Sequence, residues 1–142
     1  MDTPEVRRRL RAAIERAKRE AAGRRDRSDT AARAYAQFLN ERAVPILRTL
    51  ATALAAEGHR FQVFTPADSV RLASEGSNED YIELVLDTAQ DPPQVVGRVS
   101  RGRGRRQITS ERAVREGVPV PDLTEEDVLD FVLSEIAPFV ER

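Results

Sequence analysis

The residues best suited to chemistry are the arginines of a predicted hairpin. The candidates for polyanion binding are Arg98, Arg101, Arg103, Arg105 and Arg106. A guanidinium group is always charged and binds phosphate through two parallel N–H bonds. A two-stranded ribbon that carries several of them could lie along a nucleic-acid backbone. No aromatic residue lies among these arginines, so base stacking has no support.

The alternative, which we favour, is that these arginines pair with carboxylates of the same chain. The formal net charge of -1 hides strong segregation. Residues 1–30 have a net charge of +4, residues 92–115 one of +6, and residues 116–142 one of -7. Blocks of opposite sign can compensate each other inside a fold or between subunits, and they can also leave a basic surface for an anionic partner.

A run of carboxylates in a predicted strand, residues 79–87, suggests a metal or general-acid site. Glu83 and Asp87 share one face of that strand, but four residues of strand separate them by about 13 Å. One ion cannot bind both at that distance. We therefore predict a solvent-facing row in which Glu83 pairs with Arg71 or Arg98 across neighbouring strands.

Other catalytic chemistry finds little support. The chain has no cysteine, and His59 is its only histidine, which excludes thiolate catalysis and sites built on two histidines of one chain. His59 follows Gly58 at a predicted helix end, where a cation is favourable. No nucleophile elbow or phosphate-binding glycine loop is present. We expect no enzyme activity, no metal site and no cofactor.

The elements that position these residues begin with two predicted helices. Thr3 is the expected N-cap of the first, with a thin apolar stripe formed by Val6, Leu10, Ala13, Ala17 and Ala21. Gly23 is its expected end, and residues 24–29 form a polar connector. The second helix covers residues 30–57, and Pro45 predicts a kink or break just before it.

Alternating apolar residues then predict four or five strands. Short connections make neighbouring strands antiparallel. The last two strands, 94–100 and 105–109, flank a turn at residues 101–104, and Gly97 suggests a bulge or a close backbone approach. The expected core face of the sheet comprises Phe61, Val63, Val70, Leu72, Ile82, Leu84 and Leu86. Residues 110–122 are expected to form an extended linker.

A last helix begins after Thr124, with Asp127 at capping-box spacing and a hydrophobic staple between Leu123 and Val128. Pro138 should distort its final turn. The residues expected on its buried face are Leu129, Val132, Leu133, Ile136 and Val140, with Phe131 on the flank.

The sequence therefore predicts an α+β fold: N-terminal helices, a four- to five-stranded antiparallel meander, and a C-terminal helix packed on one sheet face. Residues 1–27 form an N-terminal amphipathic helix with its connector, and residues 28–142 form one α+β domain. Phe64, Tyr81 and Val85 lie on the open face of the sheet. With the stripe residues Val6, Leu10, Ala13 and Ala17, they are the candidates for a protein interface.

Two functional hypotheses follow. The first is a non-catalytic protein-interaction module, either a homodimer or a small accessory subunit of a bacterial complex. The second is a binder of nucleic acid or another polyanion through residues 98–106. Arginine supplies 22 of the 23 basic residues, which is typical of a GC-rich bacterial genome. A membrane-spanning helix needs about 20 consecutive apolar residues, and no segment of the sequence approaches this length. The sequence also has no apolar core of a signal peptide. We therefore expect a cytoplasmic protein without membrane contact.

Overall fold

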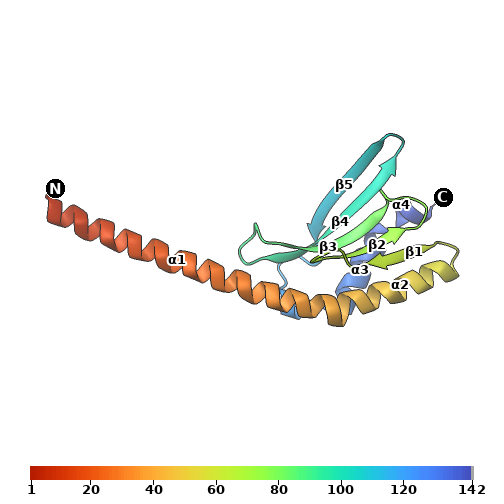
Figure 1. The fold of residues 1–142 in the computed structure, drawn as a ribbon, viewed down its shortest axis with the longest axis horizontal. Coiled ribbons are helices and arrows are strands. Elements are labelled where there is room, and N and C mark those ends of the chain that lie inside the picture. Colours follow the sequence, from red (N-terminus) through yellow and green to blue (C-terminus); the bar gives the residue numbers. More distant parts are fainter. Residues whose placement is uncertain (142) are drawn as a thin grey trace.

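The computed structural model describes residues 1–141, in which helices precede and follow a five-stranded sheet along the chain (Figure 1). The elements in order are α1 (Thr3–Phe38), the π-helical turn η1 (Leu39–Ala43), α2 (Val44–Ala56), β1 (Phe61–Phe64), β2 (Val70–Ser74), β3 (Tyr81–Asp87), β4 (Gln94–Arg103), β5 (Arg106–Ala113), the 3-10 turn η2 (Val120–Asp122), α3 (Glu125–Glu135) and α4 (Ala137–Val140). The predicted α+β fold class is confirmed.

The first helix is longer than predicted. It begins after Asp2, whose side chain accepts the N–H of Glu5 at 2.9 Å, so Asp2 rather than Thr3 is the N-cap. The expected end at Gly23 and the polar connector after it are wrong, because α1 continues to Phe38. Gly23 does not adopt the positive φ of a helix-ending glycine. Arginine is a good helix former, so the polar composition of residues 24–29 does not interrupt the helix.

The predicted distortion before Pro45 is confirmed. The π-helical turn η1 covers the five residues Leu39–Ala43, and α2 follows it directly. Proline lacks an N–H and its ring collides with the carbonyl four residues earlier. A π-helical turn adds one residue to the helical circuit and thereby accommodates this collision. Gly58 ends α2 with a φ of 89°, as its position after the helix predicts.

The sheet is an antiparallel meander with the strand order β1-β2-β3-β4-β5. Its last hairpin differs from the prediction. Arg103 pairs with Arg106, so the turn lies at Gly104 and Arg105, and Gly104 has a φ of 64°. Strand β5 also continues to Ala113 and takes up the first part of the expected linker. The hairpin extends beyond β3, whose pairing with β4 ends at Ser100 (Figure 1).

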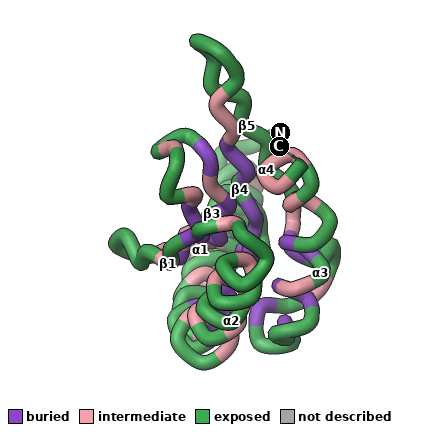
Figure 2. Tube along the Cα trace, turned by 90° about the vertical axis from the view of Figure 1, so that its right-hand side faces the viewer, coloured by how far each residue is buried: buried purple, intermediate pink, exposed green. Residues whose placement is uncertain are grey.

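One face of the sheet carries the core. Figure 2 shows the buried residues between the strands and the helices α2 and α3. A single apolar cluster joins Leu47 of α2, Leu84 of β3 and Val128 of α3. All seven residues predicted for the core face of the sheet belong to this cluster or pack against it. Burying this apolar surface, at about 25 cal/mol per Å2, is the main term that stabilises the domain.

The C-terminal helix has the predicted capping box. The Thr124 hydroxyl accepts the N–H of Asp127, and the Asp127 carboxylate accepts the N–H of Thr124. Leu123 and Val128 are both buried, as the staple requires. Pro138 follows the end of α3, and the short helix α4 replaces a continuous final turn.

One prediction about the buried face of α3 is wrong. Leu133 is 56% exposed, whereas Phe131 is fully buried. The Phe131 ring lies directly over the backbone of Gly97, where a Cβ atom would overlap it. Gly97 therefore provides a close approach between β4 and α3, and this approach turns Phe131 inward and Leu133 outward.

Candidate functional site

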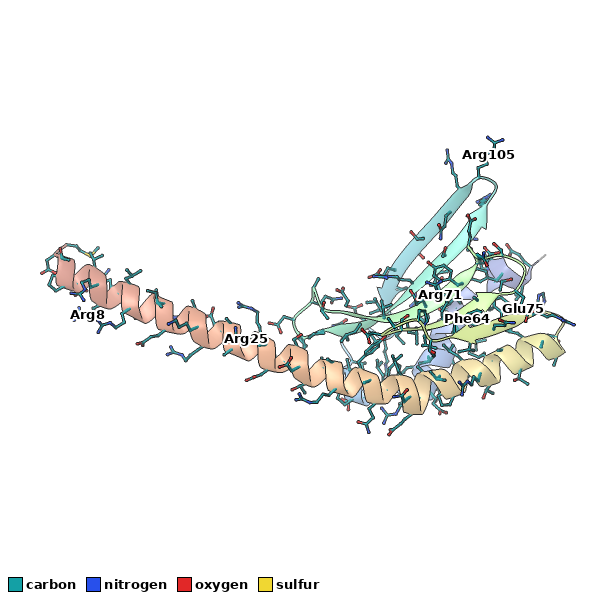
Figure 3. All side chains as sticks on the ribbon, viewed as in Figure 1. Arg8, Arg25, Phe64, Arg71, Glu75 and Arg105 are labelled. Carbon is teal, nitrogen blue, oxygen red and sulfur yellow. The ribbon has the colours of Figure 1, made fainter. Side chains whose placement is uncertain are left out.

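The five candidate arginines of the hairpin fall into two groups. Arg98 lies on the sheet proper, and its Nε donates to Glu111 on the neighbouring strand at 2.8 Å. Arg101 is half-buried. In contrast, Arg103, Arg105 and Arg106 are exposed, and none of them forms an ion pair with any residue in the range 1–141. Figure 3 shows Arg105 at the tip of the hairpin. The free charge is therefore concentrated at the end of the hairpin.

The two arginines that follow the hairpin are paired with the acidic C-terminal segment. Arg112 pairs with Glu135 at 2.7 Å, and its guanidinium stacks over the Phe131 ring at 4.4 Å. Arg115 pairs with Asp127 at 3.1 Å. The favoured alternative, compensation within the chain, thus holds for the base of the hairpin and fails for its tip.

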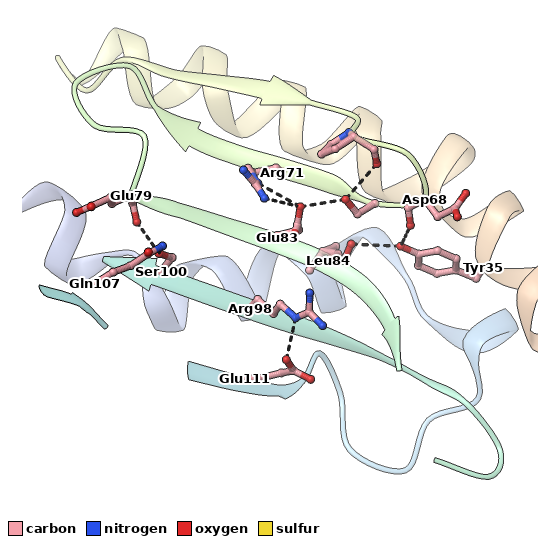
Figure 4. A network of polar contacts seen from close by, with 12 residues as sticks. Tyr35, Asp68, Arg71, Glu79, Glu83, Leu84, Arg98, Ser100, Gln107 and Glu111 are labelled. Carbon is pink, nitrogen blue, oxygen red and sulfur yellow. Dashed lines mark hydrogen bonds and ion pairs between the residues drawn. The ribbon is translucent and has the colours of Figure 1, made fainter. Parts of the chain in front are cut away.

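The hairpin is held by hydrogen bonds to the start of β3. The N–H of Gly102 donates to the carboxylate of Asp80 at 2.8 Å, and the Ser100 hydroxyl donates to the carbonyl of Glu79 at 2.6 Å. Gln107 on β5 in turn donates to the Ser100 hydroxyl (Figure 4). These bonds fix the direction in which the basic tip projects.

A row of alternating charge crosses the open face of the sheet. Arg71, Glu83, Arg98 and Glu111 lie opposite one another on β2, β3, β4 and β5. Glu83 is only 6% exposed, and one of its oxygens accepts Arg71 at 3.1 Å and the Ser69 hydroxyl at 3.0 Å (Figure 4). The predicted pairing of Glu83 with Arg71 is confirmed, but the expectation that Glu83 faces solvent is wrong, because Arg71 and Ser69 bind its carboxylate in a buried position. Glu83 therefore neutralises its neighbours on the sheet.

The apolar candidates of the open face differ in exposure. Phe64 is 48% exposed at the edge of the sheet. Tyr81 is half-buried, because the Arg71 guanidinium covers its ring at 3.9 Å. Val85 is also half-buried and lines a cleft of about 780 Å3 between α1 and the sheet. Of the three, only Phe64 offers a large apolar surface to a partner.

The same cleft contains the buried phenol of Tyr35. Burial, followed by the charges of Glu83 and Asp68, raises the pKa of Tyr35 well above its usual value. Its hydroxyl donates to the carbonyl of Asp68 at 2.6 Å and also contacts the carbonyl of Leu84 at 3.2 Å. A neutral phenol held in this way ties α1 to the sheet, and it is not poised to exchange a proton.

The N-terminal half of α1 has no cover within the chain. It leaves the domain as a free rod (Figure 1), and every residue from Val6 to Glu20 is exposed. We call residues 6–20 the free segment. Its largest apolar side chains remain in contact with solvent, with exposed fractions of 47% for Val6, 57% for Leu10 and 45% for Ile14. Ala13 and Ala17 lie on the same helical face.

Ile14 is a stripe residue that the sequence interpretation missed. It follows Leu10 by four positions, which places it on the same face of a helix, and this spacing was the available signal. At about 100° per residue, the free segment presents one stripe formed by Val6, Leu10, Ala13, Ile14 and Ala17. This stripe lies on the side of α1 that further along the helix contacts the domain.

Basic side chains border the stripe on both sides. The neighbours on one side are Arg7, Arg11 and Lys18, and those on the other side are Arg9, Arg16 and Glu20. Glu5 and Glu15 lie further round the helix, and Glu5 accepts hydrogen bonds from Arg8 and Arg9. Five of the six flanking charges are therefore positive.

A bidentate ion pair marks the point where α1 meets the domain. Arg27 donates through Nε and Nη2 to the two carboxylate oxygens of Asp91, at 2.7 and 2.8 Å. The hydrogen bond from Arg27 lowers the pKa of the Asp91 carboxyl. This pair fixes the base of the rod against the loop between β3 and β4.

Two kinds of feature are absent from residues 1–141. No group of three or more His, Asp or Glu side chains is placed to hold a metal ion there. None of the helices in that range combines the length and the apolar character that crossing a membrane requires. Comparisons of the chain with protein-family models, curated proteins and solved structures find no match.

Proposed function

We propose that this protein is a non-catalytic protein-interaction module of the bacterial cytoplasm, either a homodimer or a small accessory subunit. In this proposal the free segment of α1 is the binding element. The observation that carries the proposal is the exposure of Val6, Leu10 and Ile14 along a helix that nothing in the described chain covers.

The energetics of helices support this role. An isolated helix is marginal in water below about 12–15 residues even with favourable composition, and most helical stability in proteins comes from packing an apolar face. Residues 6–20 have an apolar face without such packing. A partner that covers the stripe would supply the missing contacts, and the rigid base at Arg27 and Asp91 would present the rod in a fixed direction.

The bonding of the buried polar groups supports a non-catalytic role. Glu83 is engaged by Arg71 and Ser69. Asp127 is engaged by the Thr124 cap and by Arg115. A general acid or base must reach a substrate proton, and these carboxylates serve ion pairs and a helix cap instead.

The hairpin tip supports a second candidate function, the binding of nucleic acid or another polyanion. Its specific observation is the exposed group of Arg103, Arg105 and Arg106, which forms no ion pair among the described residues. Arg103 and Arg106 lie opposite each other on the two strands. Such a pair suits contact with consecutive phosphates.

Site-specific photo-crosslinking tests the first proposal. A photoreactive phenylalanine analogue replaces Leu10 or Ile14 in the full chain, and the matched control carries it at Ala12, on the opposite side of the rod. We expect one defined protein adduct, identified by mass spectrometry, from positions 10 and 14 and none from position 12. Equal labelling from all three positions, or no adduct, would refute a role for the stripe.

A further inference from the structure

The exposed side of α3 is an acidic surface with an apolar centre. Leu133 is 56% exposed, and Leu129, one turn earlier, is half-buried. Glu126 and Asp130 lie beside them at helical spacing, and both are exposed. We call these four residues the α3 face. Of the other acidic residues of the helix, Asp127 and Glu135 are already paired with arginines of the β5 strand and its continuation, and Glu125 is exposed in the first turn.

The acidic residues of the α3 face are not compensated within the described chain. Neither Glu126 nor Asp130 forms an ion pair with any residue from 1 to 141. Arg115 borders the same recess, but its guanidinium donates to Asp127 at 3.1 Å. The α3 face therefore retains negative charge around an exposed leucine.

The α3 face and the free segment of α1 are complementary in charge and in length. The stripe of α1 is apolar with five basic neighbours and one acidic neighbour, whereas the α3 face is apolar with acidic neighbours. The α3 face runs over eight residues, from Glu126 to Leu133, and extends about 12 Å, because each helical residue rises about 1.5 Å. A stretch of the same length runs from Val6 to Ala13 on α1.

Charge also argues against pairing two copies of the α1 stripe with each other. Such a pair would bring the basic flanks of both helices together, and like charges across a helical interface are destabilising. An acidic partner surface removes this repulsion. One such surface, of the right length, is already present on the same protein.

We propose that a second copy of this chain covers the rod: the free segment of α1 from one protomer binds the α3 face of its partner. The arrangement is reciprocal, so two equivalent α1–α3 contacts close a two-fold dimer. This inference rests on the proposed interaction role of α1 and adds the identity of the bound surface.

Charge reversal in the full chain tests the contact by sedimentation equilibrium. One variant carries R7E and R11E, a second carries E126R and D130R, and a third combines all four. We expect each of the two double variants to raise the dissociation constant of the dimer at least about tenfold. We expect the combined variant to recover most of the affinity, because both charge signs are exchanged. The matched control, R8E with R19E on the back of the rod, should dimerise like the wild type.

Salt provides an independent readout that does not depend on any substitution. The Debye length falls from about 10 Å at 0.1 M salt to about 3 Å at 1 M. The proposed dimer should therefore dissociate as NaCl is raised across this range. A dimer that tightens with salt would indicate pairing of like-charged stripes and would overturn the inference. Circular dichroism of each variant verifies that the helices remain folded.

The remaining outcomes separate the inference from the proposed function. If photo-crosslinking at Leu10 identifies a different protein and the wild type stays monomeric, the α1–α3 dimer is refuted and the interaction role stands. If dimerisation responds to R7E with R11E but not to E126R with D130R, α1 binds another surface and the inference fails. Binding to phosphatidylglycerol vesicles without self-association also overturns it.

Discussion

Replacing Gly97 by alanine tests the packing of α3 on the sheet, on which the α3 face depends. A Cβ atom at Gly97 would lie 2.9 Å or less from three ring carbons of Phe131. Carbon atoms attract best at about 3.5–4.0 Å, and the Phe131 ring is fully buried in the core. The substitution must therefore displace the ring, and the helix that carries it, from the sheet.

The expected loss follows from two opposing effects. Overpacking a core typically costs about 1–3 kcal/mol, and replacing glycine within a strand returns about 0.5–1 kcal/mol. We expect a net loss of about 1–2 kcal/mol in the free energy of unfolding. At about 4 °C per kcal/mol for a chain of this size, the melting temperature should fall by about 4–8 °C.

Thermal unfolding followed by circular dichroism measures this loss. Combining Gly97→Ala with Phe131→Leu should cost less than the sum of the two single changes by about 1 kcal/mol, because the smaller side chain makes room for the methyl group. The matched control is Gly102→Ala on the same strand, where a Cβ would overlap the carboxylate of the exposed Glu79 side chain, which can rotate away, and would lie 3.3 Å from the Glu79 Cβ. Its effect should stay within about 0.5 kcal/mol. If Gly97→Ala leaves the free energy of unfolding unchanged, or if its effect is fully additive with that of Phe131→Leu, the described packing of α3 on the sheet is refuted.

Three further predictions concern the cap, the base of the rod and the hairpin. Thr124→Ala should lower the free energy of unfolding by about 1 kcal/mol in denaturant titrations, because it removes the N-cap of α3; an unchanged midpoint would contradict the capping box. An NMR titration should give the Asp91 carboxyl a pKa below its ordinary value, and Arg27→Gln should raise that pKa again. Since the folded-state pKa is lowered, this pair stabilises the fold above the unfolded pKa of about 3.9 and loses its effect as the pH falls through the folded value; identical titration in both proteins would rule the pair out. If the tip binds duplex DNA, replacing Arg103 and Arg105 by glutamine should weaken binding and reduce the dependence of log K on log salt by about 2; an unchanged slope would exclude the tip.

The meander could be predicted because its determinants are local. Alternating apolar residues set the two faces of each strand, and short connections leave only antiparallel pairing between neighbours. The same pattern predicts Glu83 opposite Arg71 or Arg98, and the strand register places it opposite both. The capping box at Thr124 is equally local, since donor and acceptor are three residues apart.

The length of α1 could not be predicted from the residues that usually mark a helix end. Gly23 and the charged residues after it resemble a helix end, but glycine within a helix costs only about 1 kcal/mol. Neighbouring residues that favour a helix offset that cost, and the long-range pair between Arg27 and Asp91 joins this part of the helix to the domain. The partner of Arg27 is 64 positions away, so the residues near Arg27 in the sequence do not indicate this ion pair.

The inward turn of Phe131 and the outward turn of Leu133 are likewise tertiary effects. Both residues fit an apolar helix pattern, and the choice between them depends on the space that Gly97 leaves on β4. The spacing of apolar residues therefore could not predict that Leu133 of the α3 face is exposed. The arginines show the same limit, because pairing of Arg98, Arg112 and Arg115 depends on the strand register and on the position of α3.

Hydrogen exchange of the full chain over a range of protein concentrations tests most directly whether a second copy covers the α1 rod. At low concentration the amides of residues 6–20 should exchange rapidly, because an uncovered helix opens readily. At high concentration the same amides, together with those around Leu133, should become protected as the dimer forms. Exchange rates in residues 6–20 that stay the same at every concentration would contradict the account.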